Sequence, residues 1–122
     1  MPKTIGARLV AAVAAQDASA LSACFADDVQ LRALIPKGLR EGTGAAEAAA
    51  IISKWFADAT ELDLVESQVY QVEDKLHVSY RFAVVEEGQP YLVEQHLFCV
   101  VDNGKIGRAD LLCSGFRPRA KG

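Results

Sequence analysis

The sequence predicts an α+β domain in which three N-terminal helical stretches pack on a curved, mainly antiparallel sheet. Apolar residues first recur at helical spacing, and from residue 62 onward they alternate in runs separated by tight turns. Helices followed by hairpin-linked strands are typical of segregated α+β architecture. The 122 residues suit one core, so we assign residues 1–122 to a single domain.

Two helices are predicted at the start of the chain. Residues 4–15 place Ile5 and Leu9 on one apolar stripe. Asp17 is a good N-cap for a second, short helix, which we expect residues 26–28 to end.

A strand and a third helix come next. Residues 29–33 alternate as a strand does, and Thr43 is placed to cap a helix over residues 45–59. This alanine-rich helix carries Trp55 and Phe56, which we expect to fill space at its far end.

The rest of the chain is predicted to be strands. Their ranges are residues 62–72, 76–86, 91–101 and 106–113. Turn residues separate them, including Gly88 and the Asn103–Gly104 pair. Strand alternation places Tyr80 and Phe82 on one face and His77 on the other.

The composition excludes several classes of function. The net charge of −3 is mild and the basic residues are scattered, so we expect no nucleic-acid partner. No apolar run approaches the ~20 residues of a membrane span, and no signal peptide is evident. We therefore expect a cytoplasmic protein with no membrane partner.

The cysteines and glycines predict neither a disulfide framework nor a bound cofactor. Cys24, Cys99 and Cys113 are widely separated and lie in apolar surroundings, which favours free thiols. The glycines are dispersed, so no phosphate or dinucleotide loop is present. No His, Asp or Glu cluster has the spacing of metal ligands, and we expect neither metal nor cofactor.

Several segments together resemble the nuclear transport factor 2-like superfamily, especially its SnoaL-like and ketosteroid-isomerase-like branch. The similarity covers about residues 5–116. The similarity lies in the order and spacing of six segments: residues 9–13, Gln16-Asp17, residues 24–29, Gly42-Thr43-Gly44, residues 94–98 and residues 102–106.

This resemblance implies a cone-shaped half-barrel, a cystatin-like α+β roll, whose concave side and helices enclose a pocket. It also implies a homodimer formed through the outer sheet face. We expect that face to carry Leu97, Cys99, Val101 and Leu112, because exposed apolar patches usually find partners.

The catalytic groups of the family's isomerases are mostly missing. Their helix tyrosine and aspartate base correspond to Leu9 and Ala33, and their oxyanion donor to His96. The Asp–Arg–Asp set of the family's epoxide hydrolases is not matched either. Arg108 and Asp110 lie nearby, but alternation places them on the face opposite the pocket, as an exposed or interface ion pair.

Glu94 and His96 remain as candidate catalytic residues. Two positions apart on a strand, they share a face, and a carboxylate beside an imidazole can act as an acid–base pair. The register of this strand is open, because Gln95 could equally face inward. Counting forward from Gly88 arrives one residue out of phase with the family pattern, and a β-bulge near Tyr91 would reconcile the two counts. The alternative is a structural histidine within the sheet or the dimer interface.

The function therefore has more than one hypothesis. The first is a SnoaL-like protein with an apolar pocket, in which His96 and Glu94 perform cofactor-free isomerase, cyclase or dehydratase chemistry on a small apolar molecule. Tyr80 would donate a hydrogen bond. The candidate substrate-binding residues are Tyr80, Phe82, Trp55, Phe56, Leu9, Ala33 and Leu111. The alternative is a non-catalytic ligand-binding or dimerisation module, and a transport role has no support beyond the fold.

Overall fold

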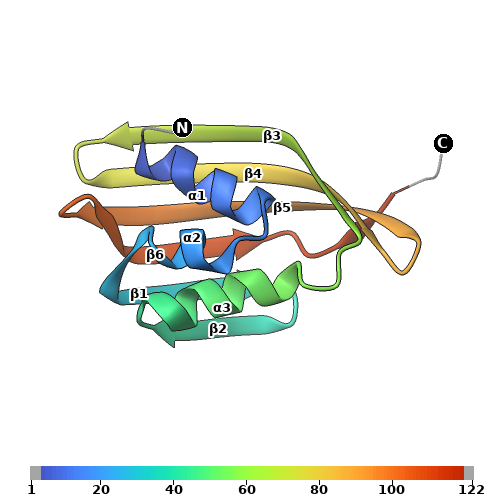
Figure 1. Ribbon diagram of the computed structural model, residues 1–122, viewed down its shortest axis with the longest axis horizontal. Helices are drawn as coiled ribbons and strands as arrows, with labels where there is room; N and C mark the ends of the chain where they lie inside the picture. The colour runs from blue at the N-terminus through green and yellow to red at the C-terminus, as the bar shows by residue number, and fades with distance from the viewer. Residues whose placement is uncertain (1–3, 120–122) are drawn as a thin grey trace.

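The computed structural model describes residues 4–119, which form three helices on one face of a seven-stranded sheet (Figure 1). The helices are α1 (Ile5–Ala14), α2 (Ala18–Ser22) and α3 (Ala45–Trp55). The strands are β1 (Phe25–Ile35), β2 (Gly38–Thr43), β3 (Glu61–Val72), β4 (Lys75–Glu86), β5 (Gln89–Asp102), β6 (Lys105–Cys113) and β7 (Arg117–Pro118). The predicted α+β class is confirmed.

Side-chain caps define the starts of α1 and α2. The side-chain oxygens of Thr4 and Asp17 each accept a hydrogen bond from a backbone N–H in the first turn, as N-caps do. Gln16 lies between the two helices and donates its amide to the carbonyl of Phe56, at 2.7 Å. This bond ties the end of α1 to the end of α3. None of the described helices is long and apolar enough to cross a bilayer.

The expectations for residues 26–28 and Thr43 were wrong. Residues 26–28 belong to β1, because the strand begins at Phe25. Thr43 is the last residue of β2, a strand that the sequence did not indicate, and Gly44 precedes the first turn of α3 without a side-chain cap. The β2 segment contains two glycines and few strand-forming residues, so its pairing with β1 determines its conformation.

The strand order is β2-β1-β6-β5-β4-β3, and β7 pairs with β5 (Figure 1). The β1–β6 pair is parallel and the other pairs are antiparallel, so the sheet is mainly antiparallel as predicted. α1 lies against β3 and β4, whereas α3 lies against β1 and β2.

The turn between β4 and β5 fixes which side chains face the helices. Glu87 and Gly88 have positive φ angles of 51° and 77° and form a two-residue turn. The pairing runs from Glu86–Gln89 to the far end of both strands without a register shift, so no bulge occurs near Tyr91. Register shifts lie elsewhere: in β1 between Phe25 and Gln30, in β3 after Leu64, and between β5 and β6 at Val100.

The two faces of the sheet differ in burial. The face under the helices forms the core, and there Leu97 is fully buried and Cys99 is 4% exposed. The expectation that both lie on the outer face was wrong, and Val101, which was expected there too, also packs against the core. Leu112 does lie on the outer face, where it is 49% exposed.

Candidate functional site

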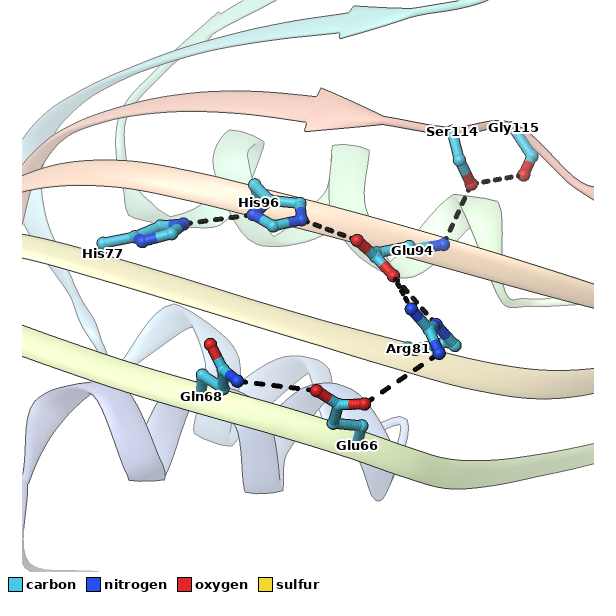
Figure 2. A network of polar contacts seen from close by, with 8 residues as sticks. All are labelled: Glu66, Gln68, His77, Arg81, Glu94, His96, Ser114 and Gly115. Carbon is cyan, nitrogen blue, oxygen red and sulfur yellow. Dashed lines mark hydrogen bonds and ion pairs between the residues drawn. The ribbon is translucent and has the colours of Figure 1, made fainter.

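Glu94 and His96 are in contact on the outer face of β5. Nε2 of His96 lies 2.7 Å from Oε2 of Glu94, and both side chains are about one-third exposed. The prediction that they share a face is confirmed. That face is directed away from the helices, however, because the residues between and beside them are buried on the inner side (Figure 2).

These two residues belong to a longer polar network across β3, β4 and β5 (Figure 2). Arg81 donates from Nε to Oε1 of Glu94 at 2.8 Å, and it also lies 3.9 Å from Glu66. At the other end, Nε2 of His77 lies 3.1 Å from Nδ1 of His96. Both histidines of the chain are therefore part of this network.

The network keeps Glu94 ionised. The hydrogen bond from His96, followed by the one from Arg81, lowers the pKa of Glu94 below its usual value, against a smaller opposing effect of burial. Glu94 is therefore an acceptor, which orients His96 with its Nε2–H toward the carboxylate.

The side chain of Tyr80 points into the core, away from Glu94 and His96. It pairs with Gln95 across β4 and β5, and its hydroxyl donates to Oε1 of Gln95 at 2.6 Å in the core. The Tyr80 hydroxyl therefore does not face His96 and Glu94, because adjacent strand positions point to opposite faces. Tyr80 does border the hollow beside those two residues. The hollow beside Glu94 and His96 measures only about 120 Å³. Their catalytic role stays a prediction.

Arg108 and Asp110 lie on the outer face, as expected. Asp110 accepts from Nε of Arg32 at 3.0 Å and lies 3.7 Å from Nε of Arg108. All three side chains are at least 40% exposed, so these contacts contribute little to stability.

Most of the predicted substrate-binding residues lie in the packed core. Exposure is 2% or less for Tyr80, Phe82, Phe56, Leu9, Ala33 and Leu111. Phe56 packs edge-on against Phe82 with ring centroids 5.5 Å apart. Their contact with a substrate stays a prediction, and a ligand among them would need space that these side chains now fill.

A series of buried hydrogen bonds runs through this core, and it was not predicted from the sequence. The amide of Gln95 accepts from Tyr80 and donates to Sγ of Cys113 at 3.4 Å. The backbone N–H of Gly115 also donates to that sulfur. Burial, reinforced by nearby thiols, raises the pKa of Tyr80 well above its usual range, so its hydroxyl stays a donor. The sequence signal for this chain of hydrogen bonds was Gln95, a polar residue whose neighbours on the same face of the strand, Val93 and Leu97, are apolar.

Cys113 also lines a larger hollow at the end of the sheet, which we call the mouth hollow. Its volume is about 440 Å³. The lining residues come from the β1–β2 turn, α3 and the C-terminal segment: Ile35, Pro36, Lys37, Trp55, Cys113, Gly115, Phe116 and Arg117. Trp55, at the end of α3, is part of this lining, and its contact with a substrate stays a prediction. Phe116 was missed, because the segment after β6 has no strong pattern.

The described residues bring together no group of three or more His, Cys, Asp or Glu side chains suited to a metal ion. Among residues 4–119, no His, Asp or Glu lines the mouth hollow, and the reactive groups there are a thiol and two cations. The outer network offers acid–base groups beside two hollows, one of about 120 Å³ next to Glu94 and His96 and one of about 410 Å³ next to His77. The two features lie on different sides of the sheet.

The fold is shared with several solved structures. A hypothetical protein with a ketosteroid isomerase-like fold from Catenulispora acidiphila, in complex with trimethylamine, is 16% identical with a TM-score of 0.74, over 91% of this chain and 85% of that chain. A proposed polyketide cyclase from Pseudomonas putida is 21% identical with a TM-score of 0.68, over 90% and 91%. A proposed isomerase from Rhodopseudomonas palustris is 18% identical with a TM-score of 0.65, over 93% and 92%.

These structural similarities support the half-barrel fold, whereas the low sequence identities support no particular activity. No curated protein matches the chain. The model of the SnoaL-like domain family matches residues 7–109, which is most of the sequence. The expected resemblance is confirmed: the chain belongs to the SnoaL-like domain family, within the nuclear transport factor 2-like fold.

Proposed function

We propose that this protein binds a small, mainly apolar molecule in the mouth hollow. The observation that carries this proposal is a hollow of about 440 Å³ whose lining includes Trp55, Phe116 and the half-buried Cys113. This volume is within the range of ligand pockets, which combine apolar walls with a few polar groups. The aromatic rings would supply most of the buried area.

The charges around the hollow favour a ligand with an anionic end. Lys37 and Arg117 are the charged residues of its lining, and both are cations. A carboxylate or sulfonate at the edge of an apolar body would pair with them while the body contacts the rings. A ligand with an ammonium group would meet two like charges instead.

The lining favours binding without acid–base catalysis. General acid–base chemistry needs a titratable group within hydrogen-bond reach of the substrate, and the hollow has no His, Asp or Glu in its lining. The Glu94–His96 pair remains the candidate for catalysis, and its substrate would have to bind on the outer face. Unchanged turnover after His96→Ala would remove that candidate.

We also propose a homodimer formed through the outer sheet face. Its support is a set of exposed apolar side chains on that face: Leu34, Leu39, Tyr70, Val72, Phe98 and Leu112. A surface with this many large apolar side chains is unfavourable in water and favours a partner. A second copy presents the same apolar surface, as an isologous interface requires.

The cytoplasm is the compartment that we propose. All three cysteines are free thiols. Free thiols are typical of a reducing compartment, whereas secreted domains of this size commonly pair them.

The binding proposal is tested with 8-anilinonaphthalene-1-sulfonate, an apolar probe with one sulfonate, titrated against the purified chain and followed by its fluorescence. We expect Phe116→Ala to weaken binding about tenfold, or about 1.4 kcal/mol. Phe98→Ala removes an equal ring from the outer face and is the matched control, expected to leave the affinity unchanged. Equal losses in both variants, or no binding by the unaltered chain, would refute the proposal.

A further inference from the structure

The sheet brings the only two histidines of the chain together. His77 is on β4 and His96 on β5, and their register makes them diagonal neighbours on the outer face. Nε2 of His77 and Nδ1 of His96 are 3.1 Å apart (Figure 2). Imidazole nitrogens are common ligands of divalent transition metals, so this approach of two ring nitrogens is chemically distinctive.

Glu94 gives His96 the tautomer that a metal ligand needs. Its Oε2 lies 2.7 Å from Nε2 of His96, so that nitrogen carries the proton and Nδ1 keeps its lone pair toward His77. Arg81 in turn holds the other oxygen of Glu94 at 2.8 Å. A carboxylate that accepts the second ring N–H is the usual support of a metal-bound histidine.

We propose that Nε2 of His77 and Nδ1 of His96 together chelate one divalent transition-metal ion of the Zn²⁺, Ni²⁺ and Cu²⁺ class. With metal–nitrogen distances of ~2.0–2.1 Å, two ligand nitrogens are about 2.9 Å apart at a right angle and about 3.3 Å apart at a tetrahedral angle. The separation of 3.1 Å lies between these values. The two nitrogens face each other nearly head-on, so each ring would turn by about 40° to direct its lone pair at a metal beside the line between them.

Aromatic contacts place the two imidazole rings side by side on the outer face. His77 stacks on Phe98 with ring centroids 4.6 Å apart and an interplanar angle of 5°, and on Tyr70 at 6.3 Å. The His96 side chain is 35% exposed. The described residues supply no third His, Cys, Asp or Glu for this group, so water would complete the coordination.

Metal binding would replace the hydrogen bond between the rings. Without metal, one ring donates its N–H to the other, and Glu94 makes His77 Nε2 the donor. With metal, the proton of neutral His77 moves from Nε2 to Nδ1 through solvent, and no net proton is released. The site therefore needs both rings neutral.

The test uses tag-free protein of the full chain carrying Cys113→Ser, which removes the half-buried thiol as a competing ligand. NiCl₂ and ZnCl₂ are titrated separately by isothermal calorimetry. We expect one ion per chain, and at least about tenfold weaker binding in His77→Phe, which keeps the stack on Phe98, and in His96→Gln. Glu94→Gln should weaken binding about 10-fold through loss of the orienting carboxylate.

Gln68→Ala changes an exposed side chain on the same face and is the matched control, expected to leave affinity unchanged. Circular dichroism confirms that each variant is folded before titration. The proposal is overturned by absence of binding in the Cys113→Ser chain, by unchanged affinity in either histidine variant, or by an equal loss in Gln68→Ala.

Discussion

Tyr80 and Gln95 lie directly opposite each other on β4 and β5, and the tyrosine hydroxyl donates to the buried amide oxygen at 2.6 Å. One position further along, Arg81 and Glu94 also pair across the same strands, but on the outer face. The sheet thus separates two polar systems. The inner one ends at the mouth hollow, and the outer one contains the two histidines.

The inner polar chain should stabilise the fold. Gln95→Leu leaves the hydroxyl of Tyr80 buried without its acceptor, and we expect a loss of about 1–3 kcal/mol in the free energy of unfolding. Adding Tyr80→Phe should recover part of that loss, because both polar partners are then gone. Urea denaturation measures each value. Gln68→Leu, on the exposed outer face, is the control and should change stability by less than about 0.5 kcal/mol.

The outer network should make stability depend on acid pH. The pKa of Glu94 is lowered in the folded chain, so its contribution is fully present above the ordinary value of 4.5 and is lost as pH falls through the lower folded value. We expect Glu94→Gln to reduce the acid dependence of the unfolding free energy in that window. An unchanged slope between the two chains would contradict the role assigned to His96 and Arg81.

The three thiols should differ in reactivity. Cys24 and Cys99 are buried, and burial raises the pKa of Cys99 to about 12, so little thiolate forms. Cys113 is only partly buried and should be the thiol that iodoacetamide alkylates in the native protein. Mass spectrometry of digested protein locates the label. Rapid labelling of Cys99 under native conditions would show that the core opens far more readily than its packing implies.

The outer face should control oligomeric state. Leu112→Glu places a charge among the exposed apolar side chains, and we expect it to convert a dimer into monomers. Ala50→Glu adds the same charge to the exposed side of α3 and should have no effect. Size-exclusion chromatography with light scattering gives the mass directly. A monomeric unaltered chain would contradict the proposed interface.

Much of this fold was predictable because its signals are local. The cap at Asp17, the apolar stripe of α1 and the alternation in β4 each depend on a few neighbouring residues. The strand β2 was not predictable in this way. Its residues have weak strand preference and are held by pairing with β1.

The register of β5 decided how the site was interpreted. A slip of one residue moves a whole strand's side chains to the other face. The two-residue turn at Glu87 and Gly88 places Gln95 opposite the inward Tyr80, which sends Glu94 and His96 outward. That turn was visible in the sequence, but the mixed polarity of both faces of β5 left the choice open. The contact of His77 with His96 follows only once this register is known.

The most direct test of ligand binding in the mouth hollow is the alkylation rate of Cys113, measured with and without saturating 8-anilinonaphthalene-1-sulfonate. Cys113 is one of the residues that line that hollow, whereas the other two thiols are buried in the core. A ligand in the mouth hollow should slow alkylation several-fold by covering the sulfur. An unchanged rate under saturating probe would place the probe elsewhere and contradict the proposed binding site.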